Sequence, residues 1–358
     1  MRAGSLVFGL GLIGLLAGAS APDAKAETAW LGLISGDAAG SETVLAADMA
    51  SLFAPNAAVR VLPMLGDAGA GNIALLLDDS HVDIAFVSTD ALAAAASGGA
   101  GASLADRLEL VARLYPQEVH ILARAEIGSL ADLAGRKVNF GPVGSGSAIT
   151  AASLFKALGI AVQPSSLDAS ASLEQLKRGA ISAAVIVGGK PSPLVSAIPA
   201  NLGIHLVPVP FGASLEAAYL PTHFEADDYP NLVQPGEELS TVATGLVLLA
   251  AKSKSDPGSP ERVARFVDTL FSRFSELQAP DRHPKWREVN LAASLPGFKR
   301  TRAAETWLAK RPGETAKPIV ARASAAQAPA LPEGLGLSAD QKEVLFKRFM
   351  EWQRGNGR

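Results

Sequence analysis

The feature that most constrains the fold of this chain is a unit of strand, small-residue loop and helix that occurs twice. In the first copy, the apolar run 30–34 leads through Gly36 and its small neighbours into a helix with an apolar face. In the second, the run 137–140 leads through Gly144-Ser145-Gly146-Ser147 into a helix that stops at Gly159. Strands that alternate with helices are typical of parallel sheets. The sequence therefore predicts an α/β fold with two lobes, each a mostly parallel sheet flanked by helices.

The correspondence between the two halves continues along the chain. A predicted helix at 72–77 precedes the strand 82–87, and a helix opened by Ser172-x-x-Gln175, the pattern of a capping box, precedes the strand 181–186. Ligands of open α/β sheets bind outside the carboxyl ends of the strands, so two facing lobes form a cleft there. The loops and helix starts at this edge supply the candidate ligand-binding residues: Gly36, Asn72, Ser88, Thr89, Gly144, Ser145, Gly146, Ser147, Gly188, Gly189 and Pro191.

The loop 141–147 has the composition of an anion cradle. Free N–H groups at a helix start, the positive end of the helix dipole and small residues together favour a carboxylate or phosphate. The alternative is a tight turn in which Ser145 or Ser147 only caps the helix. The loop lacks the Lys-Ser/Thr of a P-loop, the third glycine of a dinucleotide motif and the Gly-x-Ser-x-Gly of a nucleophile elbow. Ligand binding is therefore favoured over a reaction.

The ends of the chain differ in character from its centre. Met1-Arg2, a short apolar run and Ala24-Lys25-Ala26 form the three parts of a secretory signal, which predicts cleavage after Ala26 and a periplasmic protein; an uncleaved anchor is the alternative. The apolar stripe of the predicted helix 260–271 is expected to pack on the core. The predicted organisation is a signal peptide (1–26), lobe 1 (27–117 plus 241–311), lobe 2 (118–240), an Ala/Pro-rich linker (312–336) and a helix (337–358) that packs back onto a lobe or binds a partner or membrane surface.

Composition excludes several classes of function. The net charge is −3, and no stretch combines dense Lys/Arg with aromatic residues, which argues against nucleic acid as a partner. The absence of cysteine excludes disulfides and a lipoprotein anchor. The five histidines share no metal-ligand spacing and are expected on the surface or in loops. We therefore expect neither a metal nor a cofactor.

Several motifs, in order, resemble the TAXI family of periplasmic receptors that serve TRAP transporters. The matching residues are Tyr115-Pro116-x-Glu118-Val119-His120, the run 130–138, Gly141-Pro142-x-Gly144-Ser145-Gly146-Ser147, Gly189-x-Pro191, Tyr229-Pro230 and the run 240–244. The resemblance implies a type II periplasmic binding protein fold with two crossover strands, which we assign to the apolar runs 119–123 and 242–249. It also implies a non-enzymatic, monomeric receptor that closes on a small organic anion, an acidic amino acid or dicarboxylate, and delivers it to the membrane subunits of a TRAP-type transporter.

The first loop departs from the family pattern. An aromatic residue usually ends this loop and packs on the ligand, whereas this chain has Asp37 and Glu42 nearby and no aromatic. If both carboxylates faced the cleft, each would repel an acidic ligand by several kcal/mol at ~4 Å in a partly screened site. Because Glu42 falls in the first turn of a helix, where acids complement the dipole, we expect it to face solvent.

Two other functions remain open. A two-lobed sensor would report ligand occupancy to a membrane signalling partner, and the C-terminal helix would be its distinguishing feature. An exported serine hydrolase would use Ser145 or Ser147 with His120 or His205 as its base. The spacing supplies no third group to orient such a base, which disfavours catalysis.

Overall fold

The computed structural model describes residues 28–53, 59–97, 101–252 and 254–310. The predicted signal peptide (1–26), the Ala/Pro-rich linker (312–336) and the terminal helix (337–358) lie outside these ranges. Within them, no helix combines the length and the apolar character that a bilayer span requires.

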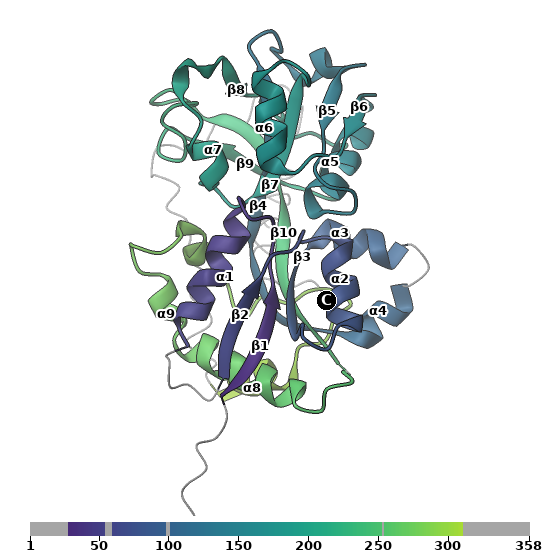
Figure 1. Ribbon diagram of the computed structural model, residues 1–358, viewed down its shortest axis with the longest axis vertical. Coiled ribbons are helices and arrows are strands. Elements are labelled where there is room, and N and C mark those ends of the chain that lie inside the picture. Colours follow the sequence, from purple (N-terminus) through teal and green to yellow (C-terminus); the bar gives the residue numbers. More distant parts are fainter. Residues whose placement is uncertain (1–27, 54–58, 98–100, 253, 311–358) are drawn as a thin grey trace, which may run out of the picture.

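The described chain forms two lobes that share a ten-stranded mixed sheet (Figure 1). The order is β2-β1-β3-β10-β4-β7-β5-β6, with β8 added to β4 and β9 to β10. The bounds are β1 Ala29–Ile34, β2 Val59–Met64, β3 Ile84–Ser88, β4 Leu108–Arg124, β5 Lys137–Asn139, β6 Gln163–Ser165, β7 Ala183–Gly188, β8 Ile204–Leu206, β9 Leu220–Phe224 and β10 Leu239–Ala251. Because β1 is parallel to β2 and β3, and β5 is parallel to β6 and β7, the predicted α/β class is confirmed.

Two long strands connect the lobes. The first part of β4 pairs antiparallel with β10, and from Glu118 onwards β4 pairs with β7 of lobe 2. Glu118 itself lies opposite both Ala243 and Gly188, so β4 leaves one lobe for the other at this residue. The apolar runs 119–123 and 242–249, assigned as crossovers from the sequence, lie within β4 and β10.

Helices cover the sheet in both lobes. Lobe 1 carries α1 Ser41–Ser51, α2 Ala70–Asp78, α3 Thr89–Ala95, α4 Gly101–Arg107, α8 Ser259–Ser272, α9 Phe274–Leu277 and α10 Arg302–Lys310; lobe 2 carries α5 Gly146–Ala157, α6 Ala169–Lys177 and α7 Pro193–Ser196. The stripe of α8 is buried in the lobe 1 core as predicted, with Phe266 stacked on Phe53 at 5.4 Å between ring centroids. Lobe 2 has separate apolar clusters on its part of the shared sheet.

The predicted start of α6 is wrong. The helix begins at Ala169 with Asp168 as its N-cap, whose carboxylate accepts a hydrogen bond from the Ala171 N–H at 2.7 Å. Ser172 lies inside the helix and donates to the Ala169 carbonyl. Asp168 is as good an N-cap as serine, so the earlier cap begins the helix first.

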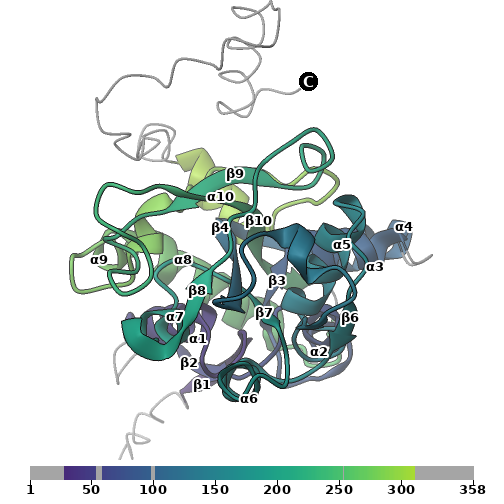
Figure 2. The ribbon, with the colours of Figure 1, turned by 90° about the horizontal axis from the view of Figure 1, so that it is seen from above.

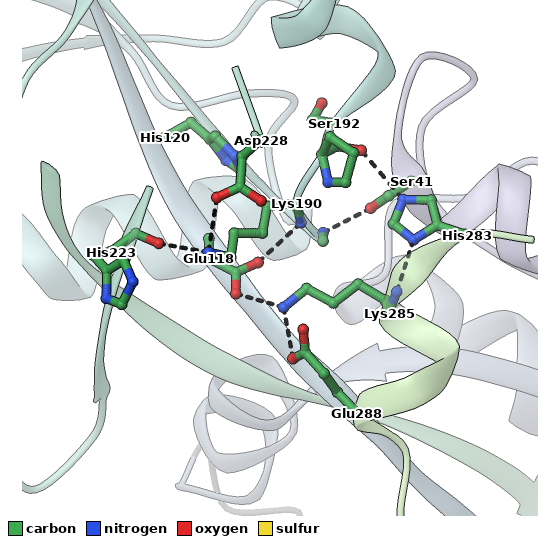
Figure 3. Close-up of polar contacts among 12 residues, drawn as sticks. Ser41, Glu118, His120, Lys190, Ser192, His223, Asp228, His283, Lys285 and Glu288 are labelled. Atoms are coloured by element: carbon green, nitrogen blue, oxygen red, sulfur yellow. Dashed lines mark hydrogen bonds and ion pairs between the residues drawn. The ribbon is translucent and has the colours of Figure 1, made fainter. Parts of the chain in front are cut away.

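A buried ion pair holds the crossing point (Figure 3). The Lys285 Nζ lies 2.5 Å from the Glu118 Oε1 and 2.8 Å from the Glu288 Oε2, and the Lys285 and Glu118 side chains are each 1 % exposed. The other Glu118 oxygen accepts the Lys190 N–H of lobe 2 at 3.0 Å. Burial opposes the charge of Lys285, but the two carboxylates outweigh it and raise the lysine pKa. The cluster thus joins β4, the 3₁₀ turn Pro284–Glu288 and the loop after β7.

A second set of buried bonds continues this cluster into lobe 2 (Figure 3). The Lys190 Nζ donates to Asp228 and to the His223 carbonyl, both at 2.8 Å. His120, which we expected at the surface, is fully buried. Its Nδ1 must donate to the Ile186 carbonyl at 3.2 Å, so in the neutral ring Nε2 accepts from the Tyr229 hydroxyl at 2.6 Å. Burial lowers the His120 pKa to about 4.

We expect Lys285→Met to destabilise the protein by about 3–5 kcal/mol, because it leaves the buried Glu118 carboxylate without its cation. Urea unfolding measures this loss. The matched control is Lys177→Met, which breaks an exposed pair with Glu174 and should change stability by no more than about 0.5 kcal/mol. Glu118→Gln combined with Lys285→Met should recover part of the loss, and equal effects of the two single lysine variants would contradict the role assigned to the cluster.

Candidate functional site

The two lobes are closed on each other. Helix α3 of lobe 1 packs against α5 of lobe 2 (Figures 1 and 2), where the Thr150 hydroxyl donates to the Asp90 carboxylate. On the other side of the cleft, the Gly189 N–H donates to the Ser41 Oγ at 2.7 Å. These contacts enclose the space between the carboxyl ends of the strands.

Backbone atoms of two small-residue loops also bond directly across the two lobes. The Gly146 N–H donates to the Asp67 carbonyl at 2.8 Å, and the Ala70 N–H donates to the Gly144 carbonyl at 3.0 Å. A Cβ on Gly69 would lie 2.2 Å from the Gly144 oxygen and 2.6 Å from the Gly146 nitrogen. Only glycine at position 69 permits this approach.

A cavity of about 70 Å³ lies between the lobes. Its polar wall comes from loops and helix starts of both lobes and from β4, and its apolar wall comes mainly from β7. The polar side chains are Asp37, Glu42, Asp67, Gln117, Asn139, Ser145 and Ser147; the apolar ones include Val185, Ile186, Val187 and Leu194. The cavity thus lies at the edge of the sheet where the sequence predicted a ligand.

The loop before α5 is both a helix cap and a lobe contact. Ser145 is the N-cap, and its Oγ accepts the Ala148 N–H at 3.1 Å. The Gly146 amide is bound to lobe 1, and the Ser145 amide donates to the Pro142 carbonyl. Among the described residues, the Ser147 amide has no acceptor, and its Oγ, which accepts the Val187 N–H, keeps a hydrogen to donate. The cradle predicted from the sequence therefore reduces to donors of Ser147 and Ser145.

The predicted binding residues divide into three groups. Gly36, Ser145, Gly146 and Ser147 line the cavity. Gly144, Gly188, Gly189 and Pro191 lie at the junction of the lobes, beside Gly69, Ser41, Lys285 and His283. Asn72, Ser88 and Thr89 lie behind the wall, within lobe 1.

Asn72 organises the cleft from behind. Its Nδ2 donates to the carbonyls of Ser35 and Phe86, at 2.6 and 2.8 Å, and its Oδ1 accepts the Asp67 N–H at 3.0 Å. The amide thereby ties the loops that follow β1 and β2 to the backbone of β3. Ser88 caps α3, and the Thr89 hydroxyl bonds to Thr244 and accepts the Gly245 N–H. These side chains already have partners within the lobe, so none of them points a free group at a ligand.

The expectation that Glu42 faces solvent is wrong. It does lie in the first turn of α1, but lobe 2 and the crossover strand cover it, and it is 3 % exposed. The Gln117 Nε2 donates to its Oε1. Burial raises the Glu42 pKa to about 7, against hydrogen bonds that lower it. The sequence did not reveal how the two lobes close on each other, and it is this closure that buries Glu42.

Gln117 was not predicted from the sequence. Its Oε1 is buried without a hydrogen-bond partner among the described residues, and the residue is 2 % exposed. It occupies the variable position of Tyr115-Pro116-x-Glu118. The alternation of side chains along β4 is a signal in the sequence that could have identified Gln117. Neighbouring residues of a strand, here Glu118 and Gln117, point to opposite faces.

The charges around the cavity are of one sign. Asp37, Glu42 and Asp67 belong to its wall, and no Lys, Arg or His is among the described residues that line it. Asp67 also accepts hydrogen bonds from the Gly69 and Asn72 N–H groups at the start of α2. A ligand in this cavity therefore meets acceptors near α1 and β4 and donors near α5.

A metal ion has only a surface candidate in the described ranges. Ligand atoms of His223, Glu225 and Glu238 lie within 4.8 Å of one another, and exposed carboxylates often gather in this way without an ion. This cluster lies outside the wall of the cavity. It has no part in the cleft.

Glu42 and His120 affect stability with opposite slopes in pH. Glu42 holds its proton more tightly when folded, so the free energy of unfolding falls between the usual glutamate pKa of 4.5 and about 7. His120 holds its proton less tightly when folded, so the free energy of unfolding rises between its folded pKa of about 4 and the usual histidine value of 6.5. Over most of this interval the two effects oppose each other.

We expect Glu42→Gln to remove the first slope, leaving a steeper rise of stability with pH and a gain of up to about 3 kcal/mol above about pH 7. Denaturant unfolding at a series of pH values measures both profiles. Glu174→Gln, on the exposed face of α6, is the control and should follow the wild-type curve. Parallel profiles for Glu42→Gln and the wild type would show that the Glu42 carboxyl is not buried in solution.

Several known structures can be superposed on part of the chain, although their sequences have low identity to it. They include a TctC solute binding protein from Polaromonas (16 % identity, 68 % of this chain and 82 % of that chain, TM-score 0.37) and the substrate binding protein of an amino acid ABC transporter (12 %, 70 % and 96 %, TM-score 0.42). A third is a Candida albicans gene product described as having the generic periplasmic binding protein fold (14 %, 79 % and 80 %, TM-score 0.45). Likenesses of this size carry no argument about ligand or partner.

A stronger match comes from sequence families. The pattern of the NMT1-like family covers residues 44–297, which run from α1 through both lobes to the segment before α10. More than half of the chain lies within that match. The protein belongs to the NMT1-like family.

Proposed function

We propose that this protein is a solute-binding receptor that captures a small polar molecule by closing its two lobes. The observation that carries the proposal is the contact of Gly69 with the Gly144–Gly146 loop, which closes the cavity with backbone atoms. Such a contact can break and re-form as the lobes open and close, because no long side chains have to be rearranged. Binding energy then shifts an equilibrium between open and closed states.

The finer parts of the proposal rest on the sequence. Export to the periplasm rests on the residues up to Ala26, and delivery to a TRAP-type transporter rests on the resemblance to TAXI receptors. The organic-anion class is supported by the donors at the start of α5 but opposed by the acidic wall opposite. The sensor alternative has the same lobes and cleft, and differs only in its partner.

The contacts give the serine hydrolase no support. Both nitrogens of His120 are bonded to Ile186 and Tyr229, and His205 lies on β8 opposite Ala123. Ser145 and Ser147 accept hydrogen bonds from backbone amides. Neither serine has a base within hydrogen-bond reach among the residues that the structure describes, so the geometry favours binding without a reaction.

Gly69→Ala tests the closing contact. The three atoms nearest to the added Cβ all belong to lobe 2 backbone, so lobe 1 should fold normally while the lobes are held apart. In the presence of the ligand, we expect solution X-ray scattering to show a larger radius of gyration for Gly69→Ala than for the wild type. Affinity for the molecule that co-purifies with the wild type, identified by native mass spectrometry, should fall at least about tenfold.

Gly212→Ala is the matched control, because a Cβ at position 212 has no atom within 4 Å. It should bind and scatter as the wild type does. A bound ligand at 100 times its dissociation constant adds about 2.7 kcal/mol, enough to shift the melting temperature by several degrees. Unimpaired binding by Gly69→Ala, or no shift of the melting temperature with any small polar metabolite, would contradict the proposed receptor function.

A further inference from the structure

One buried acceptor of the cleft has no donor among the described residues, and it lies beside a buried carboxyl. The Glu42 carboxyl is buried and bonded to Gln117, while the Gln117 Oε1 is buried and has no partner among the described residues. A buried acceptor without a donor is unfavourable, so this pair calls for a group with several hydrogens to donate.

The charge of the wall points to the same group. Asp37 and Asp67 lie in the wall with Glu42, and none of the described lining residues is basic. A ligand carboxylate on this side of the cavity would face like charges without a cation to neutralise it, whereas a ligand ammonium group would be attracted. An ammonium also has three hydrogens, enough for both Glu42 and the Gln117 Oε1.

The opposite side of the cavity has the complementary chemistry. The Ser147 amide lies at the start of α5, where the helix dipole favours an oxygen with negative character, and the Ser145 and Ser147 hydroxyls can also donate. A ligand that fits both sides has a nitrogen at one end and an oxygen acceptor at the other. The cavity of about 70 Å³ limits such a ligand to a few carbon atoms.

We propose that the cleft binds a small amine whose nitrogen lies beside both Glu42 and the Gln117 Oε1 and whose oxygen meets the start of α5, and that it rejects dicarboxylates. This inference rests on the receptor function proposed above and replaces its organic-anion ligand. If the Gln117 amide were flipped, its Nε2 rather than its Oε1 would be the free group, and the site would favour an acid. Preference for an amine or for an acid therefore distinguishes the two orientations of the amide.

Matched pairs of probes test the inference on the full chain. β-Alanine and malonate have chains of the same length and differ by an aminomethyl group in place of a carboxylate, and alanine and lactate differ by an amine in place of a hydroxyl. Isothermal titration should show the amine of each pair binding at least about tenfold more tightly than its partner. Any molecule released from the purified protein should contain a primary or secondary amine.

Variants separate recognition from folding. Glu42→Gln should weaken β-alanine at least about tenfold and leave malonate unchanged or stronger, while circular dichroism shows a folded protein. Gln117→Leu should weaken the amine without strengthening the acid. Glu174→Gln, far from the cavity, should bind as the wild type does.

The outcomes separate the inference from the receptor function. If malonate binds more tightly than β-alanine, and Glu42→Gln strengthens malonate binding further, the inference of an amine ligand is overturned. The proposed receptor function is then unaffected. A released ligand without an amine would have the same meaning. A protein that releases no ligand and binds none of the four probes would overturn both.

Discussion

The ion pair between Glu118 and Lys285 is the interaction on which the geometry of the cleft depends. A buried pair of charges is not in itself a source of large stability, since apolar residues of the same volume often serve as well. Its value here is positional: Glu118 bonds to the 284–288 turn of lobe 1 and to the Lys190 amide of lobe 2 at the residue where β4 changes partners. An apolar cluster would leave those three segments free to slide.

With the crossing point fixed, the lobes can meet through their backbones. The loops around Gly69 and Gly144–Gly146 approach so closely that a single Cβ would separate them. Glycines of this kind suggest a ligand cradle in a sequence, and here they serve mainly to bring two lobes together. The polar side chains that line the cavity come largely from other elements: Glu42 from α1 and Gln117 from β4, with Ser147 directly after the second loop.

The sequence predicted the class of fold because strand and helix periodicity are local properties. The strands, the α8 stripe and the edge that carries the cleft all follow from it. Glu42, Gln117 and His120 were missed or misplaced, since their burial comes from contacts with segments distant in the chain, such as Gly188 on Glu42 and Tyr229 on His120. Small polar loops predicted the edge of the sheet at which the cavity lies, but only the assembled lobes revealed which polar atom there has no partner among the described residues.

The buried carboxyl of Glu42 gives closure a dependence on the ligand. An ionised Glu42 in an empty closed cleft has only the Gln117 amide as a donor from another described element, whereas in an open cleft water solvates it. The empty protein is therefore biased toward opening when Glu42 is charged. A ligand that supplies a positive group to the closed form removes this bias and stabilises that form selectively, which is the differential affinity that any ligand-driven population shift requires.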